Sequence, residues 1–477
     1  MTEERPAASA KTASEAARTG FPAPQTNWTN DPNGLVFFEG EYHLFYQYNP
    51  FGDVWGHMSW GHAVSTDLIH WQELPVAIPE ADGVMIFTGS VVIDRENTSG
   101  FCLDGKPCMV AIYTGAHTAA KPPVQEQSIA YSNDRGRTWT KYAENPVLNL
   151  DLAEFRDPNV FWSAQGKRWI MAVSLPIEHR IAFYSSPDLK KWDRAGEFGP
   201  AGATSGVWEC PDMFELPLDD KPGETRWVLK VGLNPGSLQG GSGEQYFVGR
   251  FDGSRFINDN PPDLTLWTDY GKDCYCALTF NNAPAVKPPV MLGWMNNWQY
   301  AGQVPTQPWR GQMTVARELS LRTFPEGIRL VQKPVGVPAG AEKNKAPQTG
   351  TFYAKLSVDP KTTLRAGWQI RSRDGSYAEI GYDTVRKEVY VDRTHAGNTG
   401  FNKDFPARTA APYAASRGPI SFEILVDTSS IEVFTADGRI ALTNLVFFKP
   451  GGRVVRFSQG GAAKFQKAGF WPLSSIW

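Results

Sequence analysis

The chain has 477 residues, which is enough for two to four domains and a large buried core. Charged residues make up 20% of it and the formal net charge is -3, so the basic surface of a nucleic-acid-binding protein is absent. No run approaches the roughly 18 apolar residues of a membrane-spanning helix. The 17 Trp, 45 Gly and 36 Pro indicate many short strands and turns.

Residues 1–20 are rich in Ala, Thr, Ser and Glu and contain no apolar segment. They match neither a signal peptide nor a membrane anchor. We expect a disordered N-terminal tail here, of the kind that remains when a leader is missing from the sequence.

The first motif is the turn Asn30-Asp31-Pro32-Asn33-Gly34, which precedes the apolar run Leu35–Phe38. Pro32 fixes its own φ and disfavours the α region for Asp31, and Gly34 can adopt the positive φ that closes a turn. Taken alone, the motif predicts an Asx-type turn that leads into a hairpin. A catalytic role for Asp31 can be inferred only if comparable acidic residues recur at matching positions along the chain.

Similar units follow one another over residues 21–331, each with three or four short strands and no helical period. Three of them close on Ser-x-Asp followed by a tryptophan, at Trp71, Trp139 and Trp192. Five such units predict an all-β fold that begins with a five-bladed β-propeller, in which the first strand of each blade lines a central channel. The five strand starts are expected around one channel mouth, and they are Asp31, Phe87, Asp157, Glu209 and Asp273.

The five cysteines do not form a disulfide framework by count, because their number is odd. Cys102 and Cys108 are close enough in sequence to bridge a short loop. Cys274 and Cys276 lack a matching Cys or His pair, which disfavours zinc. On a regular strand their side chains would point the same way, into packing.

The amino-acid composition changes after residue 331. Residues 332–348 are rich in Pro, Gly, Ala and Lys and predict a linker. Alternating apolar and polar residues over 349–477 then predict a C-terminal β-sandwich. This second domain contains no catalytic constellation.

Three acids stand at equivalent strand starts of the predicted propeller: Asp31, Asp157 and Glu209. Converging carboxylates suit glycosidic chemistry, in which one attacks and another protonates the leaving oxygen. The alternative for each acid is a turn-capping role, and three matching positions make that alternative weaker. The seven His are scattered, and His57 and His62 do not form a metal-binding pattern, so we expect no metal site.

Three motifs occur in order around these acids: Asn27–Gly34, Phe155–Pro158 and Trp208–Asp212. They resemble the WMNDPNG, RDP and EC(P) motifs of glycoside hydrolase family 32, the β-fructosidases, which include invertases, exo-inulinases and levanases. Thr29 replaces the usual Met, and we expect this change to alter packing behind the turn. The resemblance runs from about residue 24 through the sandwich and implies a five-bladed propeller followed by a sandwich, as the repeats also do.

The resemblance implies that Asp31 is the nucleophile, Glu209 the general acid and base, and Asp157 the stabiliser of the transition state. The two reacting carboxyl groups should then lie about 5–5.5 Å apart. The pKa of Glu209 should be raised while Asp31 stays ionised. Implied substrate-binding residues are Asn30, Gln47, Trp55, Phe87, Thr88 (where Ser is common), Arg156 and Trp298, with Trp294 as the competitor of Trp298 for an aromatic wall.

Phe51–Gly56 and Gly293–Tyr300 resemble exo-inulinases and levanases more than plant cell-wall invertases. The implied activity is a retaining hydrolase that releases terminal β-D-fructofuranosyl units from levan or inulin and from sucrose, without a cofactor. The alternatives are a fructosyltransferase, an invertase restricted to sucrose, and a non-catalytic fructan-binding propeller. We expect a monomer or homodimer with no nucleic-acid or membrane partner, extracellular or periplasmic, with a cytoplasmic location left open.

Overall fold

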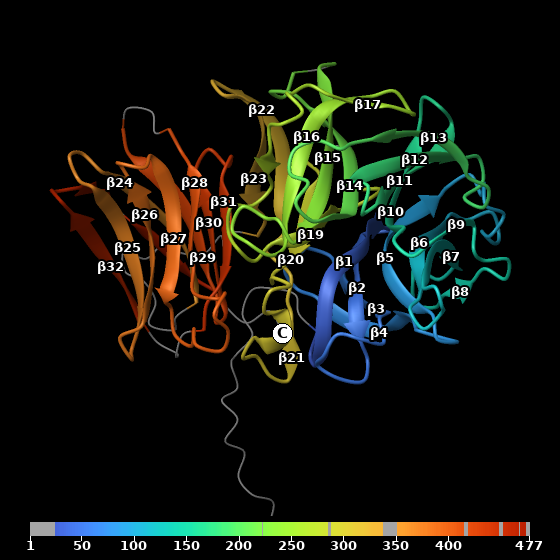
Figure 1. The fold of residues 1–477 in the computed structure, drawn as a ribbon, viewed down its shortest axis with the longest axis horizontal. Coiled ribbons are helices and arrows are strands. Elements are labelled where there is room, and N and C mark those ends of the chain that lie inside the picture. The colour runs from blue at the N-terminus through green and yellow to red at the C-terminus, as the bar shows by residue number, and fades with distance from the viewer. Residues whose placement is uncertain are drawn as a thin grey trace, which may run out of the picture.

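A computed structural model of the chain describes residues 24–221, 223–284, 288–336, 351–414, 418–447, 452–466 and 468–473. Two β-domains lie side by side, the propeller in blue to yellow and the sandwich in orange to red (Figure 1). The predicted tail 1–20 and residues 337–348 of the predicted linker lie outside the described residues. Within the part of the chain that is described, no helix is long and apolar enough to cross a membrane.

The propeller consists of five sheets in chain order, as predicted. Blade I contains β1 (Asn27–Phe38), β2 (Glu41–Asn49), β3 (Ser59–Ser65), β4 (Gln72–Ile78) and the short parallel β21 (Trp309–Arg310). Blade II contains β5 (Met85–Asp94), β6 (Cys108–His117), β7 (Val124–Ser132), β8 (Thr140–Lys141) and β9 (Leu148–Leu152). Blade III contains β10 (Arg156–Ser163), β11 (Arg168–Leu175), β12 (Arg180–Ser186) and β13 (Asp193–Phe198).

Blades IV and V complete the ring. Blade IV contains β14 (Val207–Pro217), β15 (Thr225–Asn234), β16 (Gly243–Phe251), β17 (Phe256–Asn258) and β18 (Leu266–Trp267). Blade V contains β19 (Tyr275–Thr279), β20 (Val290–Trp294), β22 (Arg317–Phe324) and β23 (Gly327–Pro334), with the 3-10 turn η1 (Ala301–Gln303) between β20 and β21. Because β23 ends at Pro334, the first three residues of the predicted linker are strand rather than linker.

The sandwich packs two antiparallel sheets face to face. One sheet has the order β31 (Ala441–Leu445), β30 (Ser430–Thr435), β29 (Ile420–Val426), β24 (Phe352–Asp359), β33 (Lys464–Phe465), with β34 (Gly469–Pro472) also on β24. The other has the order β28 (Arg408–Pro412), β27 (Glu388–His395), β26 (Tyr377–Asp383), β25 (Arg365–Ser372), β32 (Gly452–Gln459). Their apolar inner faces form a core around Trp368, Ile380 and Phe422.

The repeated Ser-x-Asp and Trp element forms the turn between the third and fourth strands of blades I to III. In blade I, Ser65 Oγ donates to Asp67 at 3.1 Å, and Trp71 Nε1 donates to the carbonyl of Leu68 at 3.2 Å. The indoles of Trp139 and Trp192 make the same bond three residues back, each at 3.0 Å. The repeat in the sequence is therefore a repeated turn structure.

Asn281, in the turn after β19, joins the blades at the centre of the ring. Its backbone N–H donates to the carbonyl of Leu35 at 2.8 Å, and its carbonyl accepts from Phe37 at 2.9 Å. Its side-chain amide donates to the carbonyls of Val91 and Val160, each at 3.0 Å. One residue of blade V thus links blades I, II and III.

The interface between the domains contains buried charges. Arg317 of β22 forms ion pairs with Asp269 at 2.9 Å and with Glu432 of the sandwich at 2.6 Å. Arg393 of the sandwich forms an ion pair with Asp273 of the propeller. The prediction that Asp273 stands at the channel mouth is therefore wrong, because this buried arginine holds the carboxylate at the interface instead.

Two disulfides are present, Cys102–Cys108 and Cys210–Cys276, and Cys274 is a buried free thiol. The predicted common orientation of Cys274 and Cys276 is wrong. Cys276 has a φ of 45° at an irregular point of β19, which breaks the strand alternation. Its side chain bonds to Cys210 of blade IV, whereas Cys274 packs into a different apolar cluster.

Candidate active site

Three acids come together on the innermost strands of blades I, III and IV. Asp31 lies in β1, Asp157 in β10 and Glu209 in β14. Asp31 and Asp157 are buried, and Glu209 keeps 17% of its side chain exposed. Their negative charges act on one another, so the three carboxyl groups form one electrostatic cluster.

The backbone explains how these strands present their acids. Each innermost strand has an irregularity in its ladder with the next strand, and such a bulge re-aims side chains. The five interruptions fall between Thr29 and Pro32 in β1, Ile86 and Gly89 in β5, Arg156 and Asn159 in β10, Glu209 and Asp212 in β14, and Tyr275 and Leu278 in β19. The site is therefore built from the same bulge repeated in every blade.

Glu209 is surrounded by hydrogen-bond donors. Arg156 donates to its Oε1 through Nε at 3.1 Å and lies 3.0 Å away through Nη2. The hydroxyl of Tyr275 donates to its Oε2. Arg156 is itself held by Gln125 Oε1 at 3.1 Å and by an ion pair with Glu154.

Asp157 is held by the backbone of the neighbouring blade. Its Oδ2 accepts from the N–H of Cys210 at 2.9 Å, and its own N–H donates to Thr114 Oγ1 at 2.9 Å. Asp157 has a φ of 66°, a conformation that this anchoring maintains. Burial raises the pKa of Asp157 to about 7, while the Arg156 guanidinium lowers it and the Glu209 charge adds to the rise.

Asp31 has weaker polar support. Its Oδ2 accepts from Thr88 Oγ1 at 3.5 Å, the long end of a hydrogen bond. Burial, followed by the charges of Glu209 and Asp157, raises the pKa of Asp31 to about 8. Nucleophilic attack requires the ionised form of Asp31, so this raised pKa has to be offset when a substrate binds.

The Cys210–Cys276 disulfide lies beside the acids. A carboxylate oxygen of Asp31 is within 4.8 Å of both sulfur atoms. The two cysteines directly follow Glu209 and Tyr275, so the bond ties together the two strands that carry this hydrogen-bonded pair. Because both sulfurs are consumed in the disulfide, they are not available as thiolate ligands for a metal.

The two candidate aromatic wall residues differ in exposure. Trp294 is fully buried, and its Nε1 donates to the carbonyl of Thr29 at 3.0 Å. Trp298 is partly exposed and stacks on Trp28 with 6.0 Å between ring centroids. Trp294 is therefore a core residue that supports Trp298. Thr29, also buried, donates through Oγ1 to the carbonyl of Gln47 at 3.0 Å.

The remaining predicted binding residues lie on blades I and II. Gln47 is buried and donates to the carbonyl of Ile86 at 3.0 Å. The side-chain oxygen of Asn30 accepts from Trp28 Nε1 at 2.8 Å. Trp55 is 45% exposed, and its ring lies edge-on to Phe87 at 6.2 Å.

Three residues of the cluster were not predicted from the sequence: Tyr275, Gln125 and Glu154. The repeat could have indicated Tyr275, because it borders the bulge of the fifth innermost strand, two residues beyond the predicted strand start. Gln125 lies in β7, away from every recognised motif, and contacts the site through Arg156.

A buried carboxylate pair with arginine, tyrosine and exposed tryptophan nearby, at one mouth of a β-propeller, is the arrangement of a glycosidase. The family models that match the chain are also those of glycosidases. The model described as glycosyl hydrolases family 32 N-terminal domain matches residues 22–334, and the one described as glycosyl hydrolases family 32 C terminal matches residues 328–472. The chain belongs to glycosyl hydrolase family 32.

Individual relatives cover nearly the whole chain. It is 43% identical over 478 residues to the levanase of Bacillus subtilis (strain 168), covering 95% of this chain and 70% of the relative. It is 40% identical over 508 residues to the extracellular exo-inulinase of Aspergillus awamori, covering 95% and 94%.

Solved structures show the same architecture. The crystal structure of the Aspergillus awamori exo-inulinase superposes with a TM-score of 0.89 at 38% identity, covering 96% of this chain and 98% of that one. A fructofuranosidase of Schwanniomyces occidentalis complexed with fructose superposes at 0.86 and 34% identity, covering 98% and 100%.

Proposed function

We propose that the protein is a retaining exo-acting β-fructofuranosidase that releases terminal β-D-fructofuranosyl units from levan or inulin and from sucrose. The observation that carries the proposal is the convergence of Asp31, Asp157 and Glu209 on one cluster, with Arg156 and Tyr275 bound to Glu209. The relatives named as levanase, exo-inulinase and fructofuranosidase support the substrate class.

The reaction uses two carboxyl groups in sequence. The Asp31 carboxylate attacks the anomeric carbon of the fructosyl unit while Glu209 gives its proton to the leaving oxygen, forming a fructosyl-enzyme. Glu209 then takes a proton from water, and the resulting hydroxide displaces Asp31 with net retention. Asp157 binds fructose hydroxyls and stabilises the positive charge that develops on the ring.

Both steps depend on where one proton lies within the cluster. With a pKa of about 8, Asp31 carries that proton at neutral pH in the ligand-free site. Attack requires Asp31 ionised and Glu209 protonated, so substrate binding must redistribute the proton. The sugar supplies hydroxyl donors to Asp31 that the free site lacks, which stabilises its charged form.

The rim residues would hold the terminal fructosyl unit. Trp298 supplies an aromatic wall backed by Trp294 and Trp28. Trp55 and Phe87 supply a second pair of aromatic rings. Polar contacts to fructose hydroxyls are assigned to Asn30, Gln47, Thr88 and Arg156.

Two variants test the catalytic assignment. Asp31→Ala is expected to abolish hydrolysis of sucrose and levan while leaving the fold intact, as judged by circular dichroism. Glu209→Ala should regain rate with added azide or with substrates that carry a good leaving group. A good leaving group departs without a general acid, and azide attacks the fructosyl-enzyme without a general base. Turnover like the parent's in a folded Asp31→Ala protein would remove the nucleophile assignment.

Product analysis tests the mode of action. Levan and inulin should each yield free fructose without intermediate oligosaccharides. A ladder of oligosaccharides would instead indicate endo cleavage or transfer to a sugar acceptor, and activity on sucrose alone would indicate an invertase.

We further propose an extracellular location, as the name of the Aspergillus awamori exo-inulinase indicates for that relative. The two disulfides suit an oxidising compartment. We propose a monomer or homodimer, and sedimentation velocity measures this oligomeric state.

A further inference from the structure

The innermost strands run from the acids to the opposite end of the propeller. Six residues separate Thr88 from Asp94 along β5, which at a rise of about 3.3 Å per residue is roughly 20 Å. At this distal end lies a cavity of about 350 Å³ between the ends of β5 and β10 and the Asn281–Asn282 turn. Its volume is in the range of ligand-binding pockets.

One side of the cavity is aromatic. Trp162, near the end of β10, is 39% exposed. It is the cross-strand partner of Trp169, with the rings edge to face at 4.9 Å. Trp169 is buried and donates through Nε1 to Thr98 Oγ1 at 2.9 Å, so it fixes the orientation of the exposed ring.

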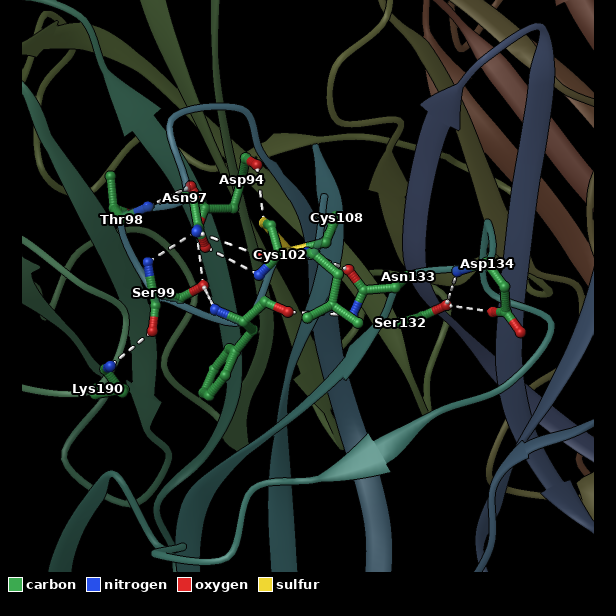
Figure 2. The surroundings of a disulfide bond; sticks show 12 residues. Asp94, Asn97, Thr98, Ser99, Cys102, Cys108, Ser132, Asn133, Asp134 and Lys190 are labelled. Carbon is green, nitrogen blue, oxygen red and sulfur yellow. Dashed lines mark hydrogen bonds between the residues drawn. A yellow bond between two sulfur atoms is a disulfide. The ribbon is translucent and has the colours of Figure 1, made fainter. Parts of the chain in front are cut away.

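The loop next to this aromatic wall is held by its own bonds (Figure 2). Both oxygens of Asp94 are occupied: one accepts from the backbone of Thr98 at 2.9 Å, the other from the backbone of Ser99 at 2.8 Å. The Cys102–Cys108 disulfide closes the loop where it returns to β6. The wall is therefore formed before any ligand arrives, which lowers the entropic cost of binding.

Polar groups at the edge of the cavity point to a neutral ligand. Arg95 donates to the side-chain oxygen of Asn282 at 2.9 Å, and Glu96 is exposed beside it. The exposed charges of Arg95 and Glu96 are opposite in sign. The Asp94 carboxylate is buried and bonded to the backbone of its own loop, so it offers no oxygen to a ligand and the lining does not select an ion of either sign. Guanidinium and amide groups can exchange their bonds for those of sugar hydroxyls.

The ligand is better described as a chain than as a single sugar. Arg95 and Asn282 also line a second cavity of about 480 Å³, whose other walls include Phe37, Phe38 and Glu39, the last paired with Arg135 at 3.5 Å. The two cavities therefore meet at the Arg95–Asn282 pair. A linear ligand could occupy one and continue into the other.

We propose that this distal cavity is a second, non-catalytic site that binds a fructan chain through stacking on Trp162. The identity of the chain rests on the proposed function. A polymer held at the distal end stays close to the enzyme, so the site raises the effective concentration of chain ends at the acids without taking part in cleavage.

The test uses affinity electrophoresis of folded full-length protein in gels that contain levan, inulin or dextran. Glu209→Gln serves as the background so that the polymer is not degraded. Levan or inulin is expected to retard this protein, and adding Trp162→Ala should weaken apparent binding about fivefold to tenfold, the scale of one aromatic contact. Trp162→Phe, which keeps a ring, should retain most of the retardation.

Ile257→Ala is the matched control, because Ile257 is also an exposed apolar side chain, 50% exposed, but lies on β17 outside both cavities. Equal retardation of the Trp162→Ala and Ile257→Ala proteins would overturn the proposal. Equal retardation by dextran would overturn the fructan assignment. A Trp162→Ala effect that sedimentation velocity traces to loss of a dimer would show an interface between copies instead.

Sucrose hydrolysis, measured in the otherwise unmodified enzyme, separates this site from the proposed function. Trp162→Ala should leave kcat and KM for sucrose unchanged while raising KM for levan or inulin. Absence of fructoside hydrolysis in the parent enzyme would refute the proposed function alone. Normal hydrolysis with no effect of Trp162→Ala on polymer binding would refute the distal site alone.

Discussion

At the scale of single residues, the three carboxyl groups of the cluster differ in the hydrogen bonds that they accept. Glu209 has Arg156 and Tyr275, Asp157 has the Cys210 N–H, and Asp31 has a long bond from Thr88. Burial, followed by the charges of Glu209 and Asp157, raises the pKa of Asp31 to about 8, and the long bond from Thr88 does little to oppose that rise. A retaining glycosidase needs one proton on its carboxyl pair, and this arrangement keeps one bound at neutral pH.

The pH dependence of kcat/KM follows from that proton. Because the raised pKa of Asp31 is about 8, the ligand-free cluster loses its proton as pH rises through that value. Without it no group can protonate the leaving oxygen, so kcat/KM for sucrose should fall about tenfold per pH unit above about pH 8. A fructoside with a good leaving group is the control, since its cleavage needs no acid and should resist the rise. An unchanged sucrose rate up to pH 10 would contradict the shared-proton account.

Tyr275 is the positioning residue for Glu209. Tyr275→Phe removes one hydroxyl that donates to the carboxylate and leaves the ring in place. Hydrogen bonds to charged groups are worth about 1.5–3 kcal/mol, so kcat should fall about tenfold to a hundredfold with a smaller change in KM. The alkaline limb of the pH profile should also shift, which a merely structural role would not cause. Tyr46→Phe is the matched control, a buried tyrosine bound to Glu73 instead.

At the scale of elements, the sequence was informative wherever chemistry coincides with a repeat. The motifs of Asp157 and Glu209 lie at strand starts, as predicted, whereas Asp31 lies inside β1, so the predicted turn is instead a bulge within a continuous strand. The structure places a bulge at all three acids. Tyr275 was missed because its bulge breaks the alternation on which strand patterns depend. Residues such as Gln125 could not be found, since their link to the site is a side-chain contact across blades.

The two disulfides give a test at this scale. Cys210–Cys276 spans 66 residues and Cys102–Cys108 spans six, so chain entropy predicts losses of about 4 and about 2 kcal/mol when each pair is changed to alanine. The order of Tm values checks this. The Cys210→Ala, Cys276→Ala pair should also lower kcat, because without the disulfide the backbone whose N–H bonds Asp157 is less firmly fixed. The Cys102→Ala, Cys108→Ala pair should leave sucrose turnover unchanged. Equal kcat losses in the two proteins would contradict a local role at the acids.

At the scale of the whole molecule, the two-domain architecture was predictable but the contact between domains was not. Propeller and sandwich strands follow from local patterns of apolar residues and turns. The interface depends on pairs far apart in sequence, such as Arg393 with Asp273 and Arg317 with Glu432. Asp273 resembled the other strand starts locally, and only its distant partner determines that it belongs to the interface.

Arg393 gives the corresponding prediction. It is fully buried and binds Asp273 and, at 2.7 Å, the hydroxyl of Tyr300, two residues beyond Trp298. Arg393→Met leaves the Asp273 carboxylate buried without its cation, which should cost about 3–5 kcal/mol of unfolding free energy. Because the segment that carries Trp298 loses an anchor, KM for sucrose should rise as well.

The double variant Arg393→Met, Asp273→Leu separates charge burial from packing, because it removes both charges together. It should recover most of the stability lost by Arg393→Met, since replacing a buried ion pair by apolar side chains is often neutral or stabilising. Arg386→Met is the matched control on the same domain: Arg386 exposes 64% of its side chain, and exposed ion pairs contribute about 0–1 kcal/mol. Urea unfolding of the parent, Arg393→Met, the double variant and Arg386→Met measures these differences in unfolding free energy. A double variant as unstable as Arg393→Met would mean that shape at the interface, rather than compensation of the Asp273 charge, holds the sandwich against the propeller.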